Sequence, residues 1–529
     1  MDTAIDDLPE GIEALRAALL AERIRIRDLE SANVRLTDQV DQLELLAEQL
    51  RRLVEQFRQL KFGKSSEKLD PNQLKLAFED VEQAIAEVQA KEEKLRPELR
   101  AKRTGERRQT RPSLPDHLPQ VDVTLEPDVT VCPCCGGALH KIGEDVSKRL
   151  DIVPVQYRIL ATHRPKYACQ SCPGQIVQAP APARVIEGGL PTEALIAHVL
   201  VEKHADHKPL YRQAQAMARQ GISIHRSVIA SWAGVGAGEI KPIWRLMHKD
   251  LLRSPILFAD ETTAPVLDPG RGRTHLGYFW TIARDPRGWG GSDPPAVVFT
   301  YAPGRHHVHA EHLLDGFCGV LQVDGYQAYS ALADKRGGAI VLAHCWSHCR
   351  REYFKLAKSD GTTPIASEAL RRIAEMYAIE AELRGQSPDI RRAGRQAKTK
   401  PLVEGFRSWA MDQLRQARPN APIADALRYT LDHWDGLTRF LQDGRVEMDS
   451  NTIERAIRPI CLTRKNSLFA GNNAAAENWA AVASIIETCK LLGINPQTYL
   501  TDVLTKLANL WPNDRLADLT PWAWKTKNN

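Results

Sequence analysis

The stretch Val320-Leu-Gln-Val-Asp324 is an apolar run that ends in an acid, and Ile256-Leu-Phe-Ala-Asp260 has the same pattern upstream. Short apolar runs of this length are typical of buried β-strands. An aspartate directly after a strand serves as a cap, a turn residue or a ligand, and each of these two alone fits a turn. Together, on neighbouring strands, they offer the hard oxygen ligands that suit Mg²⁺. Glu261 is expected on the opposite strand face, which makes it a weaker ligand candidate.

Further strand signals around these two runs define the expected sheet. Three strands follow one another as in hairpins, a helix at about 308–316 comes next, and two strands complete the set. The expected strands are Ile256–Phe258, Gly277–Ile282, Ala296–Tyr301, Val320–Val323 and Ala339–Leu342. This order predicts a mixed five-stranded sheet, and hence a multidomain α/β protein. Residues 360–445 are highly charged and carry no strand pattern, which indicates a helical segment.

A third carboxylate that could complete the acidic group is Glu454, at the start of an expected helix. Two local alternatives exist: Asn451 and Glu454 have the spacing of a capping box, and Glu454 and Arg458 could form an i,i+4 ion pair. Asp449 is close enough to be an alternative third ligand. Three carboxylates suit two Mg²⁺ or Mn²⁺ ions about 4 Å apart, which stabilise the attacking and leaving oxygens of phosphodiester displacement.

Two Cys-x-x-Cys motifs predict a structural zinc module. Cys132-Pro-Cys-Cys135-Gly-Gly and Cys169-Gln-Ser-Cys172 can each turn two thiolates toward one point, as a tetrahedral Zn²⁺ site requires. Their wide separation predicts a strand-rich insert between them. Cys134 is an additional thiol in the first motif and leaves open which pair binds. The alternatives are a redox motif or chance Cys-x-x-Cys turns.

Residues 8–60 carry a heptad repeat that predicts a parallel two-stranded coiled coil and therefore a homodimer or higher oligomer. Asn33 would fix the register of this seam, and Glu22 interrupts it. A single long helix packed on its own domain is the alternative. The seam consists of Ile12, Leu19, Ile26, Asn33, Val40, Ala47 and Val54 in one position and Leu15, Glu22, Leu29, Leu36, Leu43, Leu50 and Phe57 in the other.

The net charge of +5 is unevenly distributed. Between Arg100 and Arg111 many basic residues face a single acid, Glu106. This run follows a charged helix at about 71–94 and predicts a flexible basic linker that either lies on phosphates or is simply solvated. The sequence shows no signal peptide and no apolar run long enough to cross a bilayer, so we expect a reduced, cytoplasmic protein without a membrane partner.

The segment 184–250 is expected to be helical. A helix at 208–219, a turn at Gln220-Gly-Ile-Ser223 and a helix at 224–232 have the spacing of a helix-turn-helix. In a DNA-reading module the second helix enters the major groove, and Ser223, His225 and Arg226 would be available there. A plain helical hairpin is the alternative.

The stretch His344-Cys345-Trp-Ser-His348-Cys349 places two histidines and two cysteines at i,i+4 spacing. This spacing is compatible with a metal site. Nothing marks Cys345 and Cys349 as ligands together, however, and we do not assign a second zinc there.

Several of these stretches together resemble the transposases of the insertion sequence 66 family. The zinc module resembles that family as well, so the resemblance covers nearly the whole chain. It implies a ribonuclease-H-like catalytic domain with an Asp-Asp-Glu triad at Asp260, Asp324 and Glu454. The stretches that carry it are Asp260-Glu-Thr-Thr, Leu321-Gln-Val-Asp324-Gly-Tyr-Gln-Ala-Tyr329, Asp449-Ser-Asn-Thr-Ile-Glu454-Arg-Ala-Ile-Arg-Pro-Ile460, Arg464-Lys-Asn-Ser-Leu-Phe-Ala-Gly471, Phe62-Gly-Lys-Ser-Ser-Glu67 and Pro521-Trp-Ala-Trp524.

The resemblance implies a DNA transposase of the bacterial cytoplasm, associated with the nucleoid. Water would cut the double-stranded transposon end and leave a 3′-hydroxyl, which would then attack a target phosphodiester. Two Mg²⁺ or Mn²⁺ ions, one structural Zn²⁺ and companion proteins from the same element are the implied cofactors and partners. The alternatives are a DNA-binding regulator without catalysis and a ribonuclease-H-like nuclease that cuts without joining. The candidate DNA contacts are His348, Arg350, Arg351, Arg455, Arg458, Arg464, Lys465, Ser223, His225 and Arg226.

The expected domains follow from these segments. They are a coiled coil at 8–60, a charged helix and basic linker at 61–117, the zinc-binding module at 118–183, the helical DNA-binding region at 184–250, the first part of the catalytic core at 251–359, the helical insertion at 360–445, the third-acid helix at 446–490 and a C-terminal helical tail at 491–529.

Overall fold

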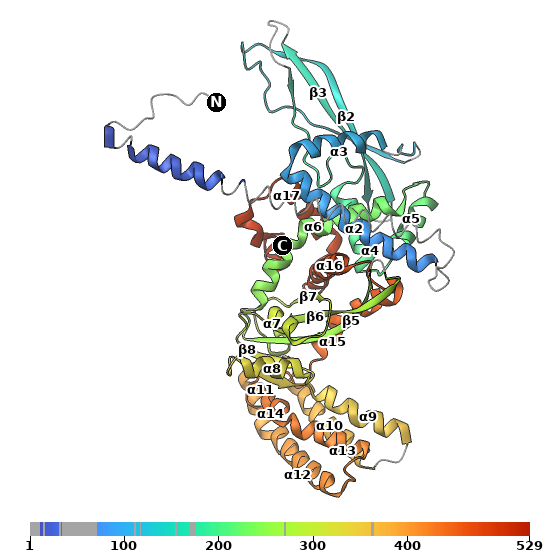
Figure 1. Ribbon diagram of the computed structural model, residues 1–529, viewed down its shortest axis with the longest axis vertical. Helices are drawn as coiled ribbons and strands as arrows, with labels where there is room; N and C mark the ends of the chain where they lie inside the picture. Colours follow the sequence, from blue (N-terminus) through green and yellow to red (C-terminus); the bar gives the residue numbers. More distant parts are fainter. Residues whose placement is uncertain are drawn as a thin grey trace.

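The computed structural model describes residues 11–13, 16–30, 33, 71–110, 113–116, 118–153, 156–169, 176–268, 271–360 and 364–528. These residues form an elongated molecule that mixes helices and sheets (Figure 1). A long hairpin of β2 (Leu139–Val153) and β3 (Gln156–Cys169) lies at one end. Helices from the segment 346–438 lie at the other end, and a five-stranded sheet lies between them.

The central sheet has the strand order β7-β6-β5-β8-β9. Strands β5, β6 and β7 are antiparallel, whereas β8 and β9 run parallel to β5. The mixed five-stranded sheet predicted from the sequence is confirmed. The bounds are β5 Ile256–Asp268, β6 Arg273–Arg284, β7 Ala296–Ala302, β8 Gly319–Val323 and β9 Ile340–His344, with a 3₁₀ turn η2 at Pro286–Trp289.

Strand β5 is longer than the sequence predicts. It pairs with β8 only over Ile256–Phe258, and then continues beside β6 as far as Asp268. The expected strand end before Asp260 is therefore wrong, because Asp260 lies inside the strand opposite Thr281. The stretch that follows contains the β-branched residues Thr262 and Thr263, which favour an extended hairpin even where the residues are polar.

Helices cover both faces of the sheet. One apolar core joins strand side chains such as Leu257 and Ala259 to one set of helices, and a second core joins Phe258 to another. Helices of the first set are α6 (Arg226–Leu251), α7 (His307–Leu313) and α8 (Gln327–Lys335). The second core is covered by α15 (Asn451–Ser467), and α16 (Asn473–Leu491) lies along the edge strand β7 and contributes to both cores.

A helical insertion follows β9 and has a core of its own, in which Trp346, Phe406 and Phe440 are buried. It begins directly after the sheet, earlier than the expected position 360. The carboxylate of Glu380 lies between the fully buried guanidinium groups of Arg391 and Arg395. The elements are α9 Trp346–Asp360, α10 Pro364–Leu383, α11 Pro388–Gly394, the π-helix η3 Arg395–Thr399, α12 Lys400–Gln416, α13 Pro422–Asp432, α14 Trp434–Thr438 and the 3₁₀ turn η4 Arg439–Leu441.

The basic run before the zinc module is a helix and not the flexible linker predicted from its charge. Helix α3 (Pro97–Thr110) folds back on α2 (Pro71–Leu95). Arg103 donates to Glu92 at 2.6 Å, and Arg107 donates to both carboxylate oxygens of Glu93 at 2.9 and 2.6 Å. The acids of α2 thus pair with two of the basic residues that were expected to be solvated or to contact phosphates.

The segment after the zinc module contains α4 (Glu193–His204), α5 (Leu210–Arg219) and α6. Gly221 has φ +77 in the turn between α5 and α6, as a tight turn between two helices requires. The second helix is far longer than the expected 224–232. Its buried face packs on α2, α4 and α16, so α6 is a central element of the fold rather than the second half of a small hairpin.

The C-terminal residues form α17 (Pro496–Ala508), the 3₁₀ turn η5 (Asn513–Leu519) and α18 (Pro521–Asn528). Helix α17 packs on α4. Across the described ranges, no helix combines the length and apolar character that crossing a membrane requires.

Much of the predicted coiled coil lies outside the described residues, including 34–60 and Leu15. The described part, 16–30, is helical, and its apolar seam side chains face solvent, with Leu19 and Leu29 about three-fifths exposed (60% and 61%).

Candidate functional site

The alternation of side chains along β5 directs Asp260 and Glu261 to opposite faces. Phe258 belongs to the core beneath α15, so Asp260, two residues on, points to the same side. Glu261 faces α8, where Tyr329 donates a hydrogen bond to its Oε2 at 3.0 Å and Arg305 donates to its Oε1 at 2.8 Å. The prediction that Glu261 lies on the other face is confirmed, and its carboxylate already has two partners.

Asp324 follows β8 on the side of the sheet that faces α15. Its neighbour in the strand, Gln322, contacts the segment that leads into α15. The Oδ1 atom of Asp324 accepts a hydrogen bond from the main-chain N–H of Tyr326 at 2.9 Å, which closes a turn. Asp324 thus closes a turn, as the sequence analysis allowed for an aspartate directly after a strand. One of its carboxylate oxygens takes no part in that turn.

Burial and mutual repulsion connect the acids electrostatically. Burial raises the pKa of Asp260 to about 8. The negative charges of Asp324, Glu261 and Glu454 contribute to the same increase. A raised pKa means that the ionised carboxylate of Asp260 is destabilised here, so a nearby cation would stabilise it. Asp260 is therefore close enough to Asp324 and to Glu454 to be repelled by each of them.

Glu454 is positioned by helix α15 and paired from helix α9. Its Oε1 accepts a hydrogen bond from Arg351 at 2.9 Å and lies 3.5 Å from Nε2 of His348. The apolar face of α15, with Ile453 and Ile457, packs beneath β5 and β6 and brings the first turn of the helix to the acids. Burial lowers the pKa of His348 below its ordinary value.

The two local alternatives for Glu454 are wrong. The helix begins after Ser450, whose side chain makes no capping hydrogen bond, and Asn451 donates instead to Asp449 at 2.8 Å. Among the described residues, Glu454 forms ion pairs with Arg351 and His348 and not with Arg458. Asp449 also accepts the main-chain N–H of Asn451 at 3.1 Å, so its carboxylate is engaged in the turn before α15.

The basic candidates for DNA contact separate into two groups. Arg464 donates to the main-chain oxygen of Thr263 and to its Oγ1, the latter at 2.8 Å, and so joins α15 to β5. Arg455, Arg458 and Lys465 project from the exposed side of the same helix. Arg350 is exposed and lies over the ring of Phe354, whereas Arg351 and His348 face Glu454. The last three candidates lie at the start of α6, namely Ser223, His225 and Arg226, and the first two of them are exposed.

Sequence reasoning missed the residues that hold this site together from a distance. Tyr429, on α13 of the insertion, donates a hydrogen bond to the main-chain oxygen of Asp324 at 2.5 Å. Gln322 and Glu447 bond to each other across a sequence separation of 125. Neither contact has a local signal. The one hint was Gln322 itself, a polar residue within an otherwise apolar strand.

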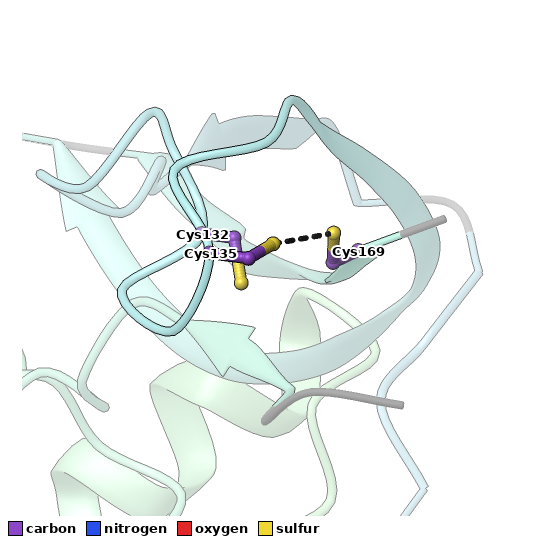
Figure 2. A group of neighbouring side chains, drawn as sticks. All are labelled: Cys132, Cys135 and Cys169. Atoms are coloured by element: carbon purple, nitrogen blue, oxygen red, sulfur yellow. Dashed lines mark hydrogen bonds between the residues drawn. The ribbon is translucent and has the colours of Figure 1, made fainter. Parts of the chain in front are cut away.

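The cysteine cluster lies where the long hairpin meets the first knuckle (Figure 2). The Sγ atoms of Cys132, Cys135 and Cys169 all lie within 4.8 Å of one another, and those of Cys135 and Cys169 are 3.6 Å apart. Leu139 on β2 pairs with Cys169 on β3, which brings the second motif back to the first. The strand-rich insert is confirmed, with the short strands β1 (Gln120–Thr124) and β4 (Val177–Gln178) beside β3.

The backbone of the first knuckle is shaped for ligation. Gly136 has φ +70, and the N–H groups of Cys132 and Gly136 close a tight turn with the carbonyls of Gly137 and Cys132. Three convergent thiols are the donor set that structural zinc prefers. Cys134 is exposed and does not belong to the cluster, and Cys172, the expected fourth ligand, lies outside the described residues.

The second cysteine and histidine stretch has separate partners. The sulfur of Cys345 accepts the main-chain N–H of Ser450 at 3.1 Å, and Cys349 bonds to Thr430 at 3.0 Å. His344 packs against His433 with ring centres 4.6 Å apart. These contacts hold the insertion against the end of β9.

Comparison with known families identifies the class of protein as a transposase. The family profile described as "Transposase IS66 family" matches residues 188–478, more than half of the chain. The profiles described as "zinc-finger binding domain of transposase IS66", "IS66 C-terminal element" and "Transposase C of IS166 homeodomain" match 130–173, 484–522 and 49–123. The chain belongs to the IS66 transposase family.

Relatives in Sinorhizobium fredii match along nearly their whole length. The protein named uncharacterized protein y4jD is 40% identical, over 93% of this chain and 97% of its own. Uncharacterized protein y4qI is 38% identical over 98% of each chain, and uncharacterized protein y4hP is 33% identical over 91% of this chain and 88% of its own.

Proposed function

We propose that this protein cleaves DNA at the ends of its own insertion element and joins the resulting 3′-hydroxyl to target DNA. Asp260, Asp324 and Glu454 are the proposed catalytic carboxylates. The observation that carries the proposal is their origin: β5, β8 and α15 supply one each to the same side of the sheet, and the pKa of Asp260 is raised to about 8. We further propose that this sheet is ribonuclease-H-like, on the basis of its strand order.

The three acids are proposed to bind two divalent cations such as Mg²⁺ or Mn²⁺. Buried, mutually repelling carboxylates are stabilised by a cation, and oxygen is the ligand type that these ions prefer. When bound, the ions would stabilise charge on the attacking and leaving oxygens of a phosphodiester. The chain's own contribution is to hold the acids in place. Glu261 is excluded from the proposed ligand set because its carboxylate lies on the other face of the sheet, where Arg305 and Tyr329 bind it.

The pairing of Arg351 with Glu454 suggests how the site is kept in order before DNA arrives. A guanidinium group at 2.9 Å offsets part of the negative charge of Glu454, which repels Asp260. Arg351 is about half exposed, so it is free to turn toward a DNA phosphate when another cation takes over the charge of Glu454. Arg455, Arg458 and Lys465 extend this basic surface along α15.

The other segments supply assembly and DNA binding. We propose that the N-terminal helix forms a parallel coiled coil, because Ile12, Leu19, Ile26 and Leu29 expose apolar side chains along one seam. The cysteine cluster is proposed to hold one structural Zn²⁺, with Cys172 as its fourth ligand. The start of α6 is proposed to contact DNA through Ser223, His225 and Arg226. The domain boundaries expected from the sequence complete the proposal, except that the helical insertion begins at Trp346 and the basic run is helix α3.

The test is an assay of cleavage and joining on a labelled DNA fragment that carries the element's terminal repeat, with Mg²⁺ present. We expect the wild-type protein to cut and join, Glu454→Gln to lose both reactions while still binding DNA, and Asp449→Asn to retain them. Asp449→Asn is the matched control because it removes a nearby acid that is engaged in a turn. DNA binding without cleavage in wild type, with companion proteins of the element supplied, would indicate a regulator, and cleavage without joining would indicate a nuclease.

A further inference from the structure

The helical insertion reaches back to the sheet at the residue that carries the second acid. The hydroxyl group of Tyr429 donates to the main-chain oxygen of Asp324 at 2.5 Å. Strand β8 ends at Val323, so this carbonyl lies just beyond the ladder that pairs β8 with β9. Tyr429 therefore gives a hydrogen-bond donor to a strand-end carbonyl that the sheet itself leaves without one.

The next residue is fixed by the same helix. Gly325 has φ +103, a backbone conformation that residues other than glycine rarely adopt. A Cβ atom at this position would lie 2.8 Å from Nε2 of His433 and 3.1 Å from the hydroxyl of Tyr429. The ring of His433 thus packs directly against the backbone after Asp324. A side chain here would have to displace either the turn or the insertion.

His433 is itself held in place from two sides. Its Nδ1 donates to the main-chain oxygen of Tyr429 at 2.8 Å, and its ring lies 4.4 Å from the Tyr429 ring, centre to centre. On its other side His344, the last residue of β9, packs edge-on at 4.6 Å. Since Val323 pairs with His344, the ends of β8 and β9 are covered by the same turn of the insertion.

We propose that Tyr429 and His433 are positioning residues that fix the Asp324-Gly325 peptide and so aim the Asp324 carboxylate at the acidic cluster. This inference rests on the proposed function. Neither side chain touches the carboxylate in the contacts described above, so both act through the backbone. The insertion is then a part of the catalytic site and not only an appended helical domain.

The experiment measures Mn²⁺ binding by the electron paramagnetic resonance signal of the free ion, with full-length protein and no DNA. The Asp324-dependent component is the difference between wild type and Asp324→Ala. Tyr429→Phe removes only the hydroxyl, and we expect it to weaken this component about tenfold, the lower end for losing a partner that orients a metal ligand. Gly325→Ala should weaken it at least as much. Retained binding in Tyr429→Phe, or no Asp324-dependent binding in wild type, overturns the inference.

Tyr353→Phe is the matched control. Tyr353 is also a buried tyrosine of the insertion, and its hydroxyl bonds to Thr430, the residue after Tyr429, at 2.8 Å. Its loss should lower stability without changing Mn²⁺ affinity. An equal effect of both variants would mean that the insertion acts only through its overall stability, and would overturn the inference. Asp324-dependent Mn²⁺ binding that needs Tyr429, in a protein that neither cuts nor joins DNA, would leave the inference intact and reject the proposed function.

Discussion

The side-chain amide of Gln322 is hydrogen-bonded in both directions to the main chain of Glu447. Its Nε2 donates to the carbonyl of Glu447 at 3.0 Å, and its Oε1 accepts the N–H of Glu447 at 2.9 Å. Gln322 precedes Asp324 by two residues, and Glu447 lies shortly before the helix that carries Glu454. One buried amide therefore links the strand of the second acid to the segment of the third.

The insertion holds the other end of this link. The carboxylate of Glu447 accepts two hydrogen bonds from the fully buried Arg391, both at 2.9 Å. Arg391 also donates to Glu380 at 2.7 Å. A buried guanidinium between two carboxylates is stable only while its partners stay in place. The position of Glu447, and through it the start of α15, is thereby connected to the core of the insertion.

Gln322→Leu should lower both stability and activity. The substitution leaves the half-buried N–H and carbonyl of Glu447 without the Gln322 amide, which costs up to about 1–3 kcal/mol for each group left unsatisfied. Urea unfolding measures the stability, and the cleavage assay measures the effect on the acids. We expect the loss of cleavage to exceed what the unfolded fraction explains.

Gln396→Leu is the control for this prediction. Gln396 donates to the main-chain oxygen of Leu441 inside the insertion, at 2.8 Å, and within the described residues it makes no hydrogen bond to the strands. It should lower stability to a similar extent and leave the cleavage rate of folded protein unchanged. If the two variants cleave DNA equally well, the link between Gln322 and Glu447 has no role in positioning the acids.

These contacts mark the limit of what the sequence could predict. The positions of the strands along the chain, and the placement of Asp260 and Asp324 on neighbouring strands, follow from local patterns, namely short apolar runs and one intervening helix. The extension of β5 past Asp260 was missed because its outer half is polar and is stabilised by pairing with β6. The basic run at 100–110 was misread as a flexible linker because its acidic partners lie on a different helix. Tyr429 and Glu447 reach the site through tertiary packing that no local period reports.

The cysteines can be separated by single substitutions. Cys132→Ser removes one of the three convergent thiols, and we expect the bound zinc to fall from about one per chain to near zero, since a structural site needs all its ligands. The open end of the hairpin, where Leu139 pairs with Cys169, should then become susceptible to protease. Zinc content measured by atomic absorption checks the first effect. Cys134→Ser should change neither result, because Cys134 is exposed and outside the cluster. If both variants lose zinc equally, the exclusion of Cys134 from the zinc ligands is wrong.

Two arginines of the same helix should behave differently. Arg464→Ala removes the donor to Thr263 and should lower the free energy of unfolding by about 1–2 kcal/mol. Arg458 is exposed on α15, so Arg458→Ala should leave the unfolding midpoint unchanged. Its effect should appear in DNA binding, where losing one phosphate contact reduces the slope of log affinity against log salt by about one. A normal salt slope in Arg458→Ala would exclude this residue from the DNA interface.

The stability of the protein should fall as the pH drops below 6.5, partly because of His204 on α4. Its imidazole is buried, its Nδ1 has no hydrogen-bond partner within the described part of the chain, and burial together with the charges of Lys203 and His207 holds its pKa well below the usual range. The folded protein thus keeps His204 neutral. Above pH 6.5 the unfolded chain is neutral at this position as well, so no stability is lost there.

Below pH 6.5 the unfolded chain takes up a proton at His204 that the folded chain does not, so stability decreases with each further pH unit by up to about 1.4 kcal/mol. His204→Leu removes this titrating group and keeps an apolar side chain in the buried position. We expect the variant's unfolding free energy, measured in urea from pH 8 to pH 5, to fall less steeply below pH 6.5 than that of wild type. The slope of wild type should remain in part, because burial also lowers the pKa values of His198 and His248. Parallel curves for the two proteins would show that His204 takes up its proton equally in the folded and unfolded states.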